Sequence, residues 1–415
     1  MHPFSPSRAL TRVRRSSLRP APAPPPPGTA FLAQGEPDFP TPQPITEALH
    51  QALRDGHTHY GDINGDPELR TLIAESATQL ASEPYAEREV LVSHGGSAAI
   101  TATMLAVLDP GDRVVIPEPA YSLYPDAVRL AGGEPVLVPL TDDHHLDLDA
   151  LSAVLPGARM IVLCNPSNPT GSVLPPRQLH ALGELLAGTD TLVLVDEAYS
   201  ELVYDGVEFV SCLAVESLRE RLIYCNTLSK TYAMTGWRLG YALAPADITA
   251  AIRHVHRTFN FSVNSAVQRA ALTALRLGPA LAAPMLRAYQ ERRDHVTERL
   301  AAMDVLYAEE PEGAFYSFAR YDVALPSADL VQLLLQDGVA VRAGREFGPS
   351  GEGHLRISFA ADFDTLDEGI TRLSHSLNRL RTEHGPADQA RQERRSRRPR
   401  SPAQGQGWWC ARTRG

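Results

Sequence analysis

Short apolar runs alternate with helical patterns along the central part of the chain. Each run is apolar at successive positions rather than at alternate ones, which is typical of strands that are covered on both faces. Strands of this kind, separated by helical segments, predict a mostly parallel sheet between helices, which is an α/β fold. The expected strands cover residues 90–93, 113–116, 135–138, 159–164, 191–195 and 222–225.

The pattern changes after residue 245. Residues 246–302 predict helices with one break near 259–265, and strands then alternate with helices in a shorter stretch. This predicts a second, smaller α+β unit, beside which we expect residues 28–34 to pack. Its expected strands are 313–318, 339–342 and 355–359, and its expected helices are 327–336 and 364–380.

The two ends of the chain differ from the body. Residues 1–28 contain five arginines, no acidic residue and a proline run, and residues 381–415 contain Arg-Ser-Pro clusters. Such segments bury too little apolar surface to fold, so we expect both to be disordered. The first also resembles an organelle transit peptide, although a disordered extension is favoured. The expected division of the body is an N-terminal segment over 29–44, a large domain over 45–295 and a small C-terminal domain over 296–380.

Composition and charge limit the function. No apolar run approaches the roughly 20 residues that a membrane span needs, so we expect no membrane partner. The formal net charge of −10 resides in the body, because both ends are basic, and this argues against a nucleic-acid partner. Four cysteines lack CxxC or metal-ligand spacing, which predicts no metal site and fits a reduced cytoplasmic setting.

Lys230 is the only lysine among 39 lysine and arginine residues. Arginine replaces lysine wherever a cation is enough, but its guanidinium stays protonated and cannot attack a carbonyl. A single remaining lysine therefore indicates Schiff-base chemistry, for which burial in a pocket would lower the pKa of the amine. Codon bias with one residual surface lysine explains the count equally well. The neighbouring motifs decide between Schiff-base chemistry and codon bias.

Polar motifs follow the expected strands, at the sheet edge where α/β proteins bind ligands. His94-Gly95-Gly96-Ser97 lies between a strand and a helix, whose first N–H groups suit a phosphate, although a simple turn explains it as well. It is neither a P-loop nor a G-x-G-x-x-G motif, so ATP and NAD lack support. Arg238 and Thr227 are candidate phosphate ligands.

Three further features suit a planar, charged ligand. Asp196 ends a buried strand, where a carboxylate needs a cation such as a protonated pyridine nitrogen or, alternatively, an arginine. Tyr121 follows another strand and can stack on a ring, although core packing explains it as well. Arg356 lies within an apolar strand and needs an anion, either a substrate carboxylate or an internal acid.

These motifs together resemble the signature of the class I/II aminotransferases, over about residues 30–380. The residues that carry the resemblance are Asn168-Pro169-Thr170-Gly171, Asp196-Glu197-Ala198-Tyr199, Ser229-Lys230, Gly236-Trp237-Arg238 and Arg356. The resemblance implies a fold-type I enzyme that depends on pyridoxal 5'-phosphate (PLP), with a large domain and a smaller α+β domain. It further implies a homodimer with shared active sites that acts in amino acid metabolism. Such an enzyme transfers the amino group of an L-α-amino acid to a 2-oxo acid by a ping-pong mechanism through pyridoxamine phosphate.

The resemblance also implies a role for each matching residue. Lys230 would bind PLP covalently and act as the catalytic base and acid, and Asp196 would keep the pyridine nitrogen protonated. Arg356 would bind the substrate α-carboxylate, assisted by Asn168 and the backbone of Gly35. The remaining implied contacts are those of Tyr199 and Asn168 with the ring hydroxyl, of Tyr121 with the ring face, of Gly96, Ser97, Thr227 and Arg238 with the phosphate, and of Tyr60 with the phosphate of the neighbouring subunit.

The sequence leaves the substrate and the reaction outcome open. Residues 58–60, 199–202 and 347–350 resemble arginine–pyruvate transaminases. Bacterial aspartate aminotransferases commonly carry lysine where Ser97 stands, and Arg345 is the candidate substitute. PLP-dependent lyases of the C–S β-eliminating or aminocyclopropane-forming type share the same motifs. A non-enzymatic regulator on this fold would carry a fused helix-turn-helix domain, for which the N-terminal extension is too short.

Overall fold

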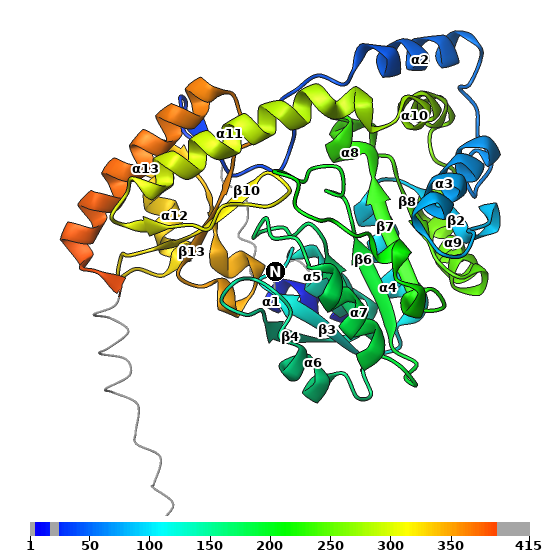
Figure 1. Cartoon of the computed structure of the whole chain (residues 1–415), viewed down its shortest axis with the longest axis horizontal. Helices are drawn as coiled ribbons and strands as arrows, with labels where there is room; N and C mark the ends of the chain where they lie inside the picture. The colour runs from blue at the N-terminus through cyan, green and yellow to red at the C-terminus, as the bar shows by residue number, and fades with distance from the viewer. Residues whose placement is uncertain (1–4, 17–24, 388–415) are drawn as a thin grey trace, which may run out of the picture.

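A seven-stranded sheet and a four-stranded sheet, with a two-stranded sheet in addition, organise the described part of the chain (Figure 1). The structure is a computed structural model that describes residues 5–16 and 25–387. Within these residues the larger sheet has seven strands, and β8 alone runs antiparallel to its neighbours. The expected mostly parallel sheet is thereby confirmed. In spatial order its strands are β2 (Val90–Ser93), β8 (Gly240–Leu243), β7 (Leu222–Thr227), β6 (Leu192–Asp196), β5 (Met160–Cys164), β3 (Arg113–Glu118) and β4 (Glu134–Pro139).

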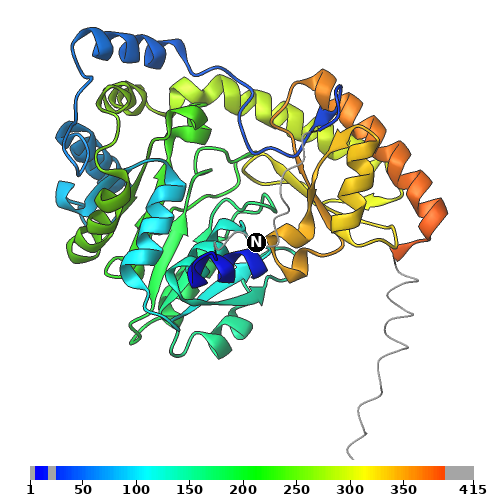
Figure 2. The same ribbon diagram turned by 180° about the vertical axis from the view of Figure 1, so that it is seen from behind.

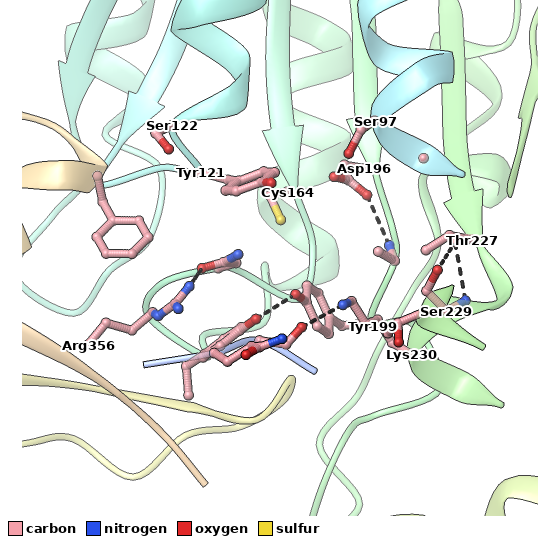
Figure 3. Close-up of a pocket in the computed structure, with 18 of the residues that line it drawn as sticks. Ser97, Tyr121, Ser122, Cys164, Asp196, Tyr199, Thr227, Ser229, Lys230 and Arg356 are labelled. Carbon is pink, nitrogen blue, oxygen red and sulfur yellow. Dashed lines mark hydrogen bonds between the residues drawn. The ribbon is translucent and has the colours of Figure 1, made fainter. Parts of the chain in front are cut away.

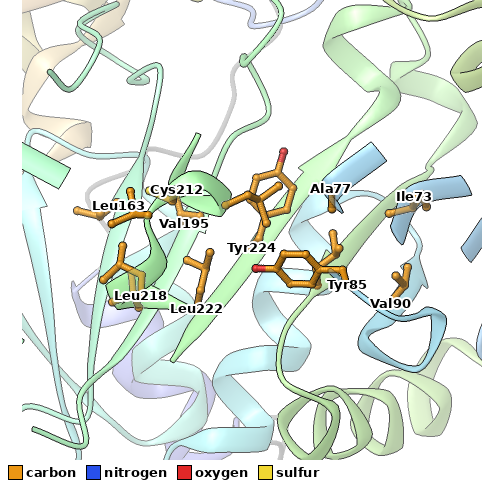
Figure 4. Packing of buried hydrophobic residues seen from close by; sticks show 14 of the residues in the cluster. Ile73, Ala77, Tyr85, Val90, Leu163, Val195, Cys212, Leu218, Leu222 and Tyr224 are labelled. Carbon is orange, nitrogen blue, oxygen red and sulfur yellow. The ribbon is translucent and has the colours of Figure 1, made fainter. Parts of the chain in front are cut away.

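Alternate residues of these strands pack into two different apolar layers, one on each face of the sheet. Val193 and Val195 belong to one buried cluster, whereas Leu192 and Leu194 belong to the other. Successive side chains of a strand point to opposite faces, so a strand that is apolar throughout requires helices on both sides. Figure 4 shows part of the first layer, where strand and helix residues meet. The first layer receives residues from α3 (Pro67–Leu80), α6 (Leu148–Val154), α7 (Pro176–Leu185) and α10 (Ser265–Leu277), and the second from α4 (Gly96–Val107), α5 (Leu123–Ala131) and α9 (Ala246–Asn260).

The smaller sheet lies to one side of the larger one (Figure 1). Its strands are antiparallel, and a third buried cluster joins them to the helices that cover them. In spatial order the strands are β12 (Arg342–Ala343), β13 (His354–Ser358), β10 (Tyr316–Tyr321) and β9 (Leu306–Tyr307), and the helices are α11 (Ala283–Ala301), α12 (Ser327–Gln336) and α13 (Phe363–His384).

A short strand, which precedes the strands of the large sheet in the sequence, pairs with this smaller unit. Strand β1 (Ala30–Phe31) runs parallel to β11 (Val339–Ala340), as the expected packing of residues 28–34 requires. The single strand expected over 339–342 is wrong, because its two halves have different partners. Strand β11 pairs with β1, whereas β12 pairs with β13.

The expected disorder of residues 1–28 is wrong for residues 8–16, which form helix α1 (Arg8–Ser16). Figure 2 shows α1, in dark blue, against the part of the chain that contains the large sheet. Leu10 and Val13 are half-buried on a helix that contacts α5, and Arg12 Nε donates to the carbonyl oxygen of Arg129 at 3.1 Å. This docking surface supplies the apolar contact that a free arginine-rich segment lacks. Residues 1–4 and 17–24 lie outside the described residues.

Continuous helices span the positions at which the tail and the domain boundaries were expected. Helix α13 extends to His384, so the start of the tail expected at residue 381 is helical, and residues 388–415 lie outside the described residues. Helices α2 (Gln43–Arg54) and α11 run through the boundaries expected at 44/45 and 295/296. The division into domains at these positions stays a prediction. Among the described helices, none has both the length and the apolar character of a membrane span.

Candidate active site

A cavity of about 430 Å³ opens at the carboxyl ends of β5, β6 and β7 and reaches the smaller sheet (Figure 3). Residues from both sheets line it, although they are far apart in the sequence. All but one of the site residues expected from the sequence lie on its wall, and the exception is Tyr60. The lining residues expected from the sequence are Gly35, Gly96, Ser97, Tyr121, Asn168, Asp196, Tyr199, Thr227, Lys230, Arg238 and Arg356.

Lys230 projects into this cavity from the short helix α8 (Leu228–Thr231). Thr227 caps that helix, because its side chain accepts a hydrogen bond from the backbone N–H of Ser229 at 3.2 Å. The Lys230 Nζ donates to the carbonyl oxygen of Gly35 at 2.6 Å. Burial lowers the pKa of the Lys230 amine to about 8, against the opposing charge of Glu36. The amine is thus partly unprotonated near neutral pH, as nucleophilic and base catalysis require.

Asp196 places a carboxylate at the end of the buried strand β6. Its Oδ2 accepts a hydrogen bond from the Tyr124 hydroxyl at 2.9 Å, and its Oδ1 accepts one from the Ala198 N–H at 3.2 Å. Burial raises the pKa of this carboxyl group, and the two hydrogen bonds oppose the rise. Among the described residues no basic side chain forms an ion pair with Asp196. A cation bound in the cavity is therefore the natural partner of this carboxylate.

The turn between β2 and α4 forms a tight cradle at another wall of the cavity. Gly95 has a φ of +80°, and a Cβ there would lie 2.6 Å from Nη2 of Arg238. A Cβ at Gly240 would lie 2.7 Å from the backbone nitrogen of Gly96, so this backbone tolerates no side chain. The Thr227 and Ser229 hydroxyls lie 2.8 Å apart beside it. Helix N-terminal N–H groups, hydroxyls and a guanidinium together suit a phosphate.

Arg356 is buried on β13 without a carboxylate partner among the described residues. Its Nη1 donates to Oδ1 of Asn168 at 2.9 Å and its Nη2 to the carbonyl oxygen of Ala33 at 2.7 Å, while its Nε has no hydrogen-bond partner within residues 5–16 and 25–387. The guanidinium also lies 4.2 Å from the centre of the Tyr316 ring. A buried cation that meets only neutral acceptors is an anion site.

Aromatic side chains close the space between these charged groups (Figure 3). Tyr121 stands edge-to-face with Tyr124 at 5.6 Å between ring centres. The hydroxyls of Tyr199 and Tyr316 lie 2.9 Å apart, which connects β10 of the smaller sheet to the loop after β6. Both phenols are buried, and burial raises their pKa values. They are therefore hydrogen-bond donors and acceptors rather than phenolates.

Tyr60 lies outside this cavity. It is 85% exposed and stands edge-to-face with Phe261 at 4.9 Å between ring centres, in a separate hollow that His94 also lines. Its expected contact is with a neighbouring subunit, so its place outside this cavity leaves that prediction untested.

Arg345, the candidate substitute for a lysine at position 97, is exposed and does not line the cavity, so that suggestion is not supported.

Sequence reasoning missed several lining residues. Tyr124 lies in the first turn of α5, three positions after Tyr121, and this spacing of about one helical turn carried a signal for it. Tyr316 had no signal, because its place depends on how the smaller unit packs against the larger one, and Phe347 enters only as part of the resemblance over residues 347–350. The further lining residues that were not expected are Phe31, Ala33, Gln34, Ile100, Ser122, Cys164, Ala198, Ser229, Thr235, Arg342 and Glu346.

The residues of the cavity fit PLP. The cradle at Gly95 offers N–H groups for a phosphate, and the Lys230 amine is free of any ion pair among the described residues. Asp196 offers an unpaired buried carboxylate for a pyridinium nitrogen. Each polar group of the cofactor would thus meet a complementary group of the protein.

Comparison with known proteins identifies the family. Residues 30–373 match the family described as aminotransferase class I and II. A bifunctional aspartate aminotransferase and glutamate/aspartate-prephenate aminotransferase of Petunia hybrida is 37% identical, over 83% of this chain and 76% of its own length. A probable N-acetyl-LL-diaminopimelate aminotransferase of Bacillus subtilis is 39% identical, over 82% of this chain and 87% of its own length. The crystal structure of an aromatic aminotransferase from Pyrococcus horikoshii matches with a TM-score of 0.83 at 34% identity, over 89% of this chain and 99% of that one.

These relatives agree on the reaction and the cofactor, while their names differ in substrate. The expected fold class, enzyme class and cofactor are confirmed. The chain belongs to the class I and II aminotransferases, and it is a PLP-dependent enzyme that moves the amino group of an amino acid to a 2-oxo acid.

Proposed function

We propose that Lys230 is the catalytic residue of this transfer and that Arg356 fixes the substrate by its α-carboxylate. The observation that carries the proposal is the placement of both groups on one cavity. A partly unprotonated amine and a buried guanidinium without an acid face the same space. A substrate held by its carboxylate at Arg356 would therefore present its Cα to Lys230.

PLP, when bound, supplies an electron sink for the charge that develops at the substrate Cα. The side chain of Lys230 takes up the Cα proton at Nζ and later returns a proton as a general acid. Arg356 and Asn168 orient the substrate so that the Cα–H bond faces that amine. Water exclusion by Tyr121, Tyr199 and Tyr316 keeps the proton from exchanging with solvent.

The cofactor contacts are proposed from the same geometry. Asp196, oriented by Tyr124, would hold the ring nitrogen, and Tyr199 and Asn168 would hold the ring hydroxyl. Tyr121 would cover the ring face. Gly96, Ser97, Thr227 and Arg238 would bind the phosphate at the start of α4.

A direct test uses the single lysine. Borohydride reduction of the holoenzyme should attach the cofactor to Lys230 and protect the chain from a lysine-specific protease. Mass spectrometry of a tryptic digest locates the adduct. Cleavage after complete reduction would disprove the covalent role of Lys230.

A second test separates transfer from elimination. With one amino acid and no 2-oxo acid, a transaminase converts its cofactor to pyridoxamine phosphate in a single turnover and then stops. A lyase would keep releasing product and retain PLP. Absorbance spectra of the holoenzyme, recorded with a panel of amino acids, distinguish the two outcomes.

We also propose that the enzyme is a cytoplasmic homodimer. The exposed rings of Tyr60, Phe259 and Phe261, together with Leu53, support a protein interface on one side of the large unit. The free cysteines Cys164, Cys212 and Cys225 fit a reducing compartment. Sedimentation of the wild-type protein and of a Phe261→Glu variant would test the dimer.

A further inference from the structure

Arg342 and Glu346 form an ion pair on the wall of the active-site cavity. The contact joins Nη2 of Arg342 to Oε2 of Glu346. The proposed catalytic and cofactor contacts use neither residue. Burying a charged side chain costs free energy unless the charge is paired with an opposite charge of the protein or of a ligand.

The register of the smaller sheet places Arg342 beside Arg356. The two residues are Cα partners across the antiparallel strands β12 and β13. Directly opposed residues in such a pair project from the same face, with Cα atoms about 4.5–5.5 Å apart. Both side chains line the cavity. The proposed site for the α-carboxylate therefore has a second guanidinium next to it.

Of the two side chains in the ion pair, Arg342 is the more exposed to the cavity. The side chain of Glu346 is 5% exposed, whereas that of Arg342 is 27% exposed. Oε1 of Glu346 also accepts a hydrogen bond from the Ala343 N–H at 3.4 Å, which fixes the carboxylate behind the wall. A guanidinium has five N–H donors, so one arginine can serve a buried carboxylate and a ligand carboxylate together.

We propose that Arg342, oriented by Glu346, binds a second carboxylate at the end of the substrate side chain. The favoured substrates are then dicarboxylic amino acids and the corresponding 2-oxo acids. This inference rests on the proposed role of Arg356 as the α-carboxylate site. A cationic side chain fits less well, because it would approach Arg342 before it reached Glu346.

The binding test compares succinate with butanoate on the PLP-loaded enzyme. The two acids have the same carbon chain, and succinate alone carries a second carboxylate. Calorimetry should show succinate binding about 10- to 100-fold more tightly than butanoate to the wild type, as expected for a hydrogen bond between charged groups. Arg342→Gln should bring this ratio close to one and leave butanoate binding unchanged. Arg345→Gln, which removes an exposed arginine three residues away, should leave the ratio as in the wild type.

Kinetics supply a second readout on the same proteins. The ratio of kcat/KM for glutamate to that for glutamine should fall by about 10-fold or more in Arg342→Gln, and kcat/KM for alanine should stay within about threefold. A loss that is equal for glutamate, glutamine and alanine would overturn the inference and give Arg342 a purely structural role. A wild-type preference for arginine or lysine over glutamate, abolished in Glu346→Gln, would overturn it in favour of a cationic side chain. Failure of both acids to bind the wild type would remove the proposed role of Arg356 and, with it, this inference.

Discussion

The hydroxyl of Tyr124 donates a hydrogen bond to Oδ2 of Asp196 at 2.9 Å and so joins helix α5 to the end of strand β6. The two residues are 72 positions apart. The carboxylate that would pair with the cofactor ring is thereby held in one orientation. Tyr124 is fully buried, and its ring also contacts Tyr121.

Removing this hydrogen bond should weaken cofactor binding. We expect Tyr124→Phe to lower the affinity for PLP by about 10-fold, because hydrogen bonds to charged groups contribute about 1.5–3 kcal/mol. Titration of the apoenzyme with PLP, followed by absorbance, measures the effect. Tyr289→Phe is the matched control, since its buried hydroxyl has no hydrogen-bond partner among the residues that the structure describes. Equal affinities for the wild type and both variants would show that Tyr124 does not orient Asp196.

Replacing the lysine should remove catalysis while the protein stays folded. We expect Lys230→Ala and Lys230→Arg each to lose more than about a thousandfold in kcat/KM, since acid–base catalysis alone contributes about 100- to 10,000-fold. The arginine variant retains the positive charge, so it separates the amine from the cation. Thermal unfolding curves check that both variants fold. Substantial turnover by Lys230→Arg would rule out the proposed proton transfer.

The amine of Lys230 should react at a lower pH than an ordinary lysine. Burial lowers its pKa to about 8 from the ordinary lysine value of 10.5, so the neutral, nucleophilic form accumulates as the pH rises through 8. We expect labelling of the apoenzyme by a small amine reagent to rise with a midpoint near pH 8. Peptide mapping separates Lys230 from the chain N-terminus. A midpoint above pH 10 would contradict the desolvated environment.

Loss of the Arg356 guanidinium should act on substrate binding. We expect Arg356→Gln to reduce kcat/KM for every amino donor by about 100-fold, because a charge-assisted hydrogen bond contributes about 1.5–3 kcal/mol. The KM should rise more than kcat falls, and PLP affinity should stay unchanged. Arg320→Gln provides the control, since Arg320 is exposed on the same sheet. A selective loss of PLP binding would place Arg356 with the cofactor instead.

Glu197 should make stability depend on pH. Burial raises the pKa of its carboxyl group to about 7, although Ser211 and the Cys212 N–H donate hydrogen bonds to it. The folded state therefore binds more protons than the unfolded state between about pH 4.5 and 7, and the free energy of unfolding should fall as the pH rises through that window. The contribution is on the order of 3 kcal/mol. Urea denaturation across the window should show a flatter profile for Glu197→Gln, and identical profiles would refute the assignment.

The sequence by itself determined the architecture and most of the site. Runs that are apolar at every position required a sheet with helices on both faces, and the two buried clusters on either side of β6 follow from that pattern. Polar residues at strand ends converge on one edge of a parallel sheet, which is why Asn168, Asp196 and Lys230 were predictable as neighbours. Strand β8 was not predicted, because Gly240 and Ala242, two of its four residues, are depleted in strands.

Tertiary structure alone decided the contacts that join distant parts of the chain. The register of β12 on β13 puts Arg342 beside Arg356, and the packing of the smaller unit brings Tyr316 to Tyr199. Helix α1 is ordered because α5 offers a surface that a local sequence reading does not contain. Local patterns fix which face of an element is buried, whereas the partner of that face depends on the relative placement of elements far apart in the sequence.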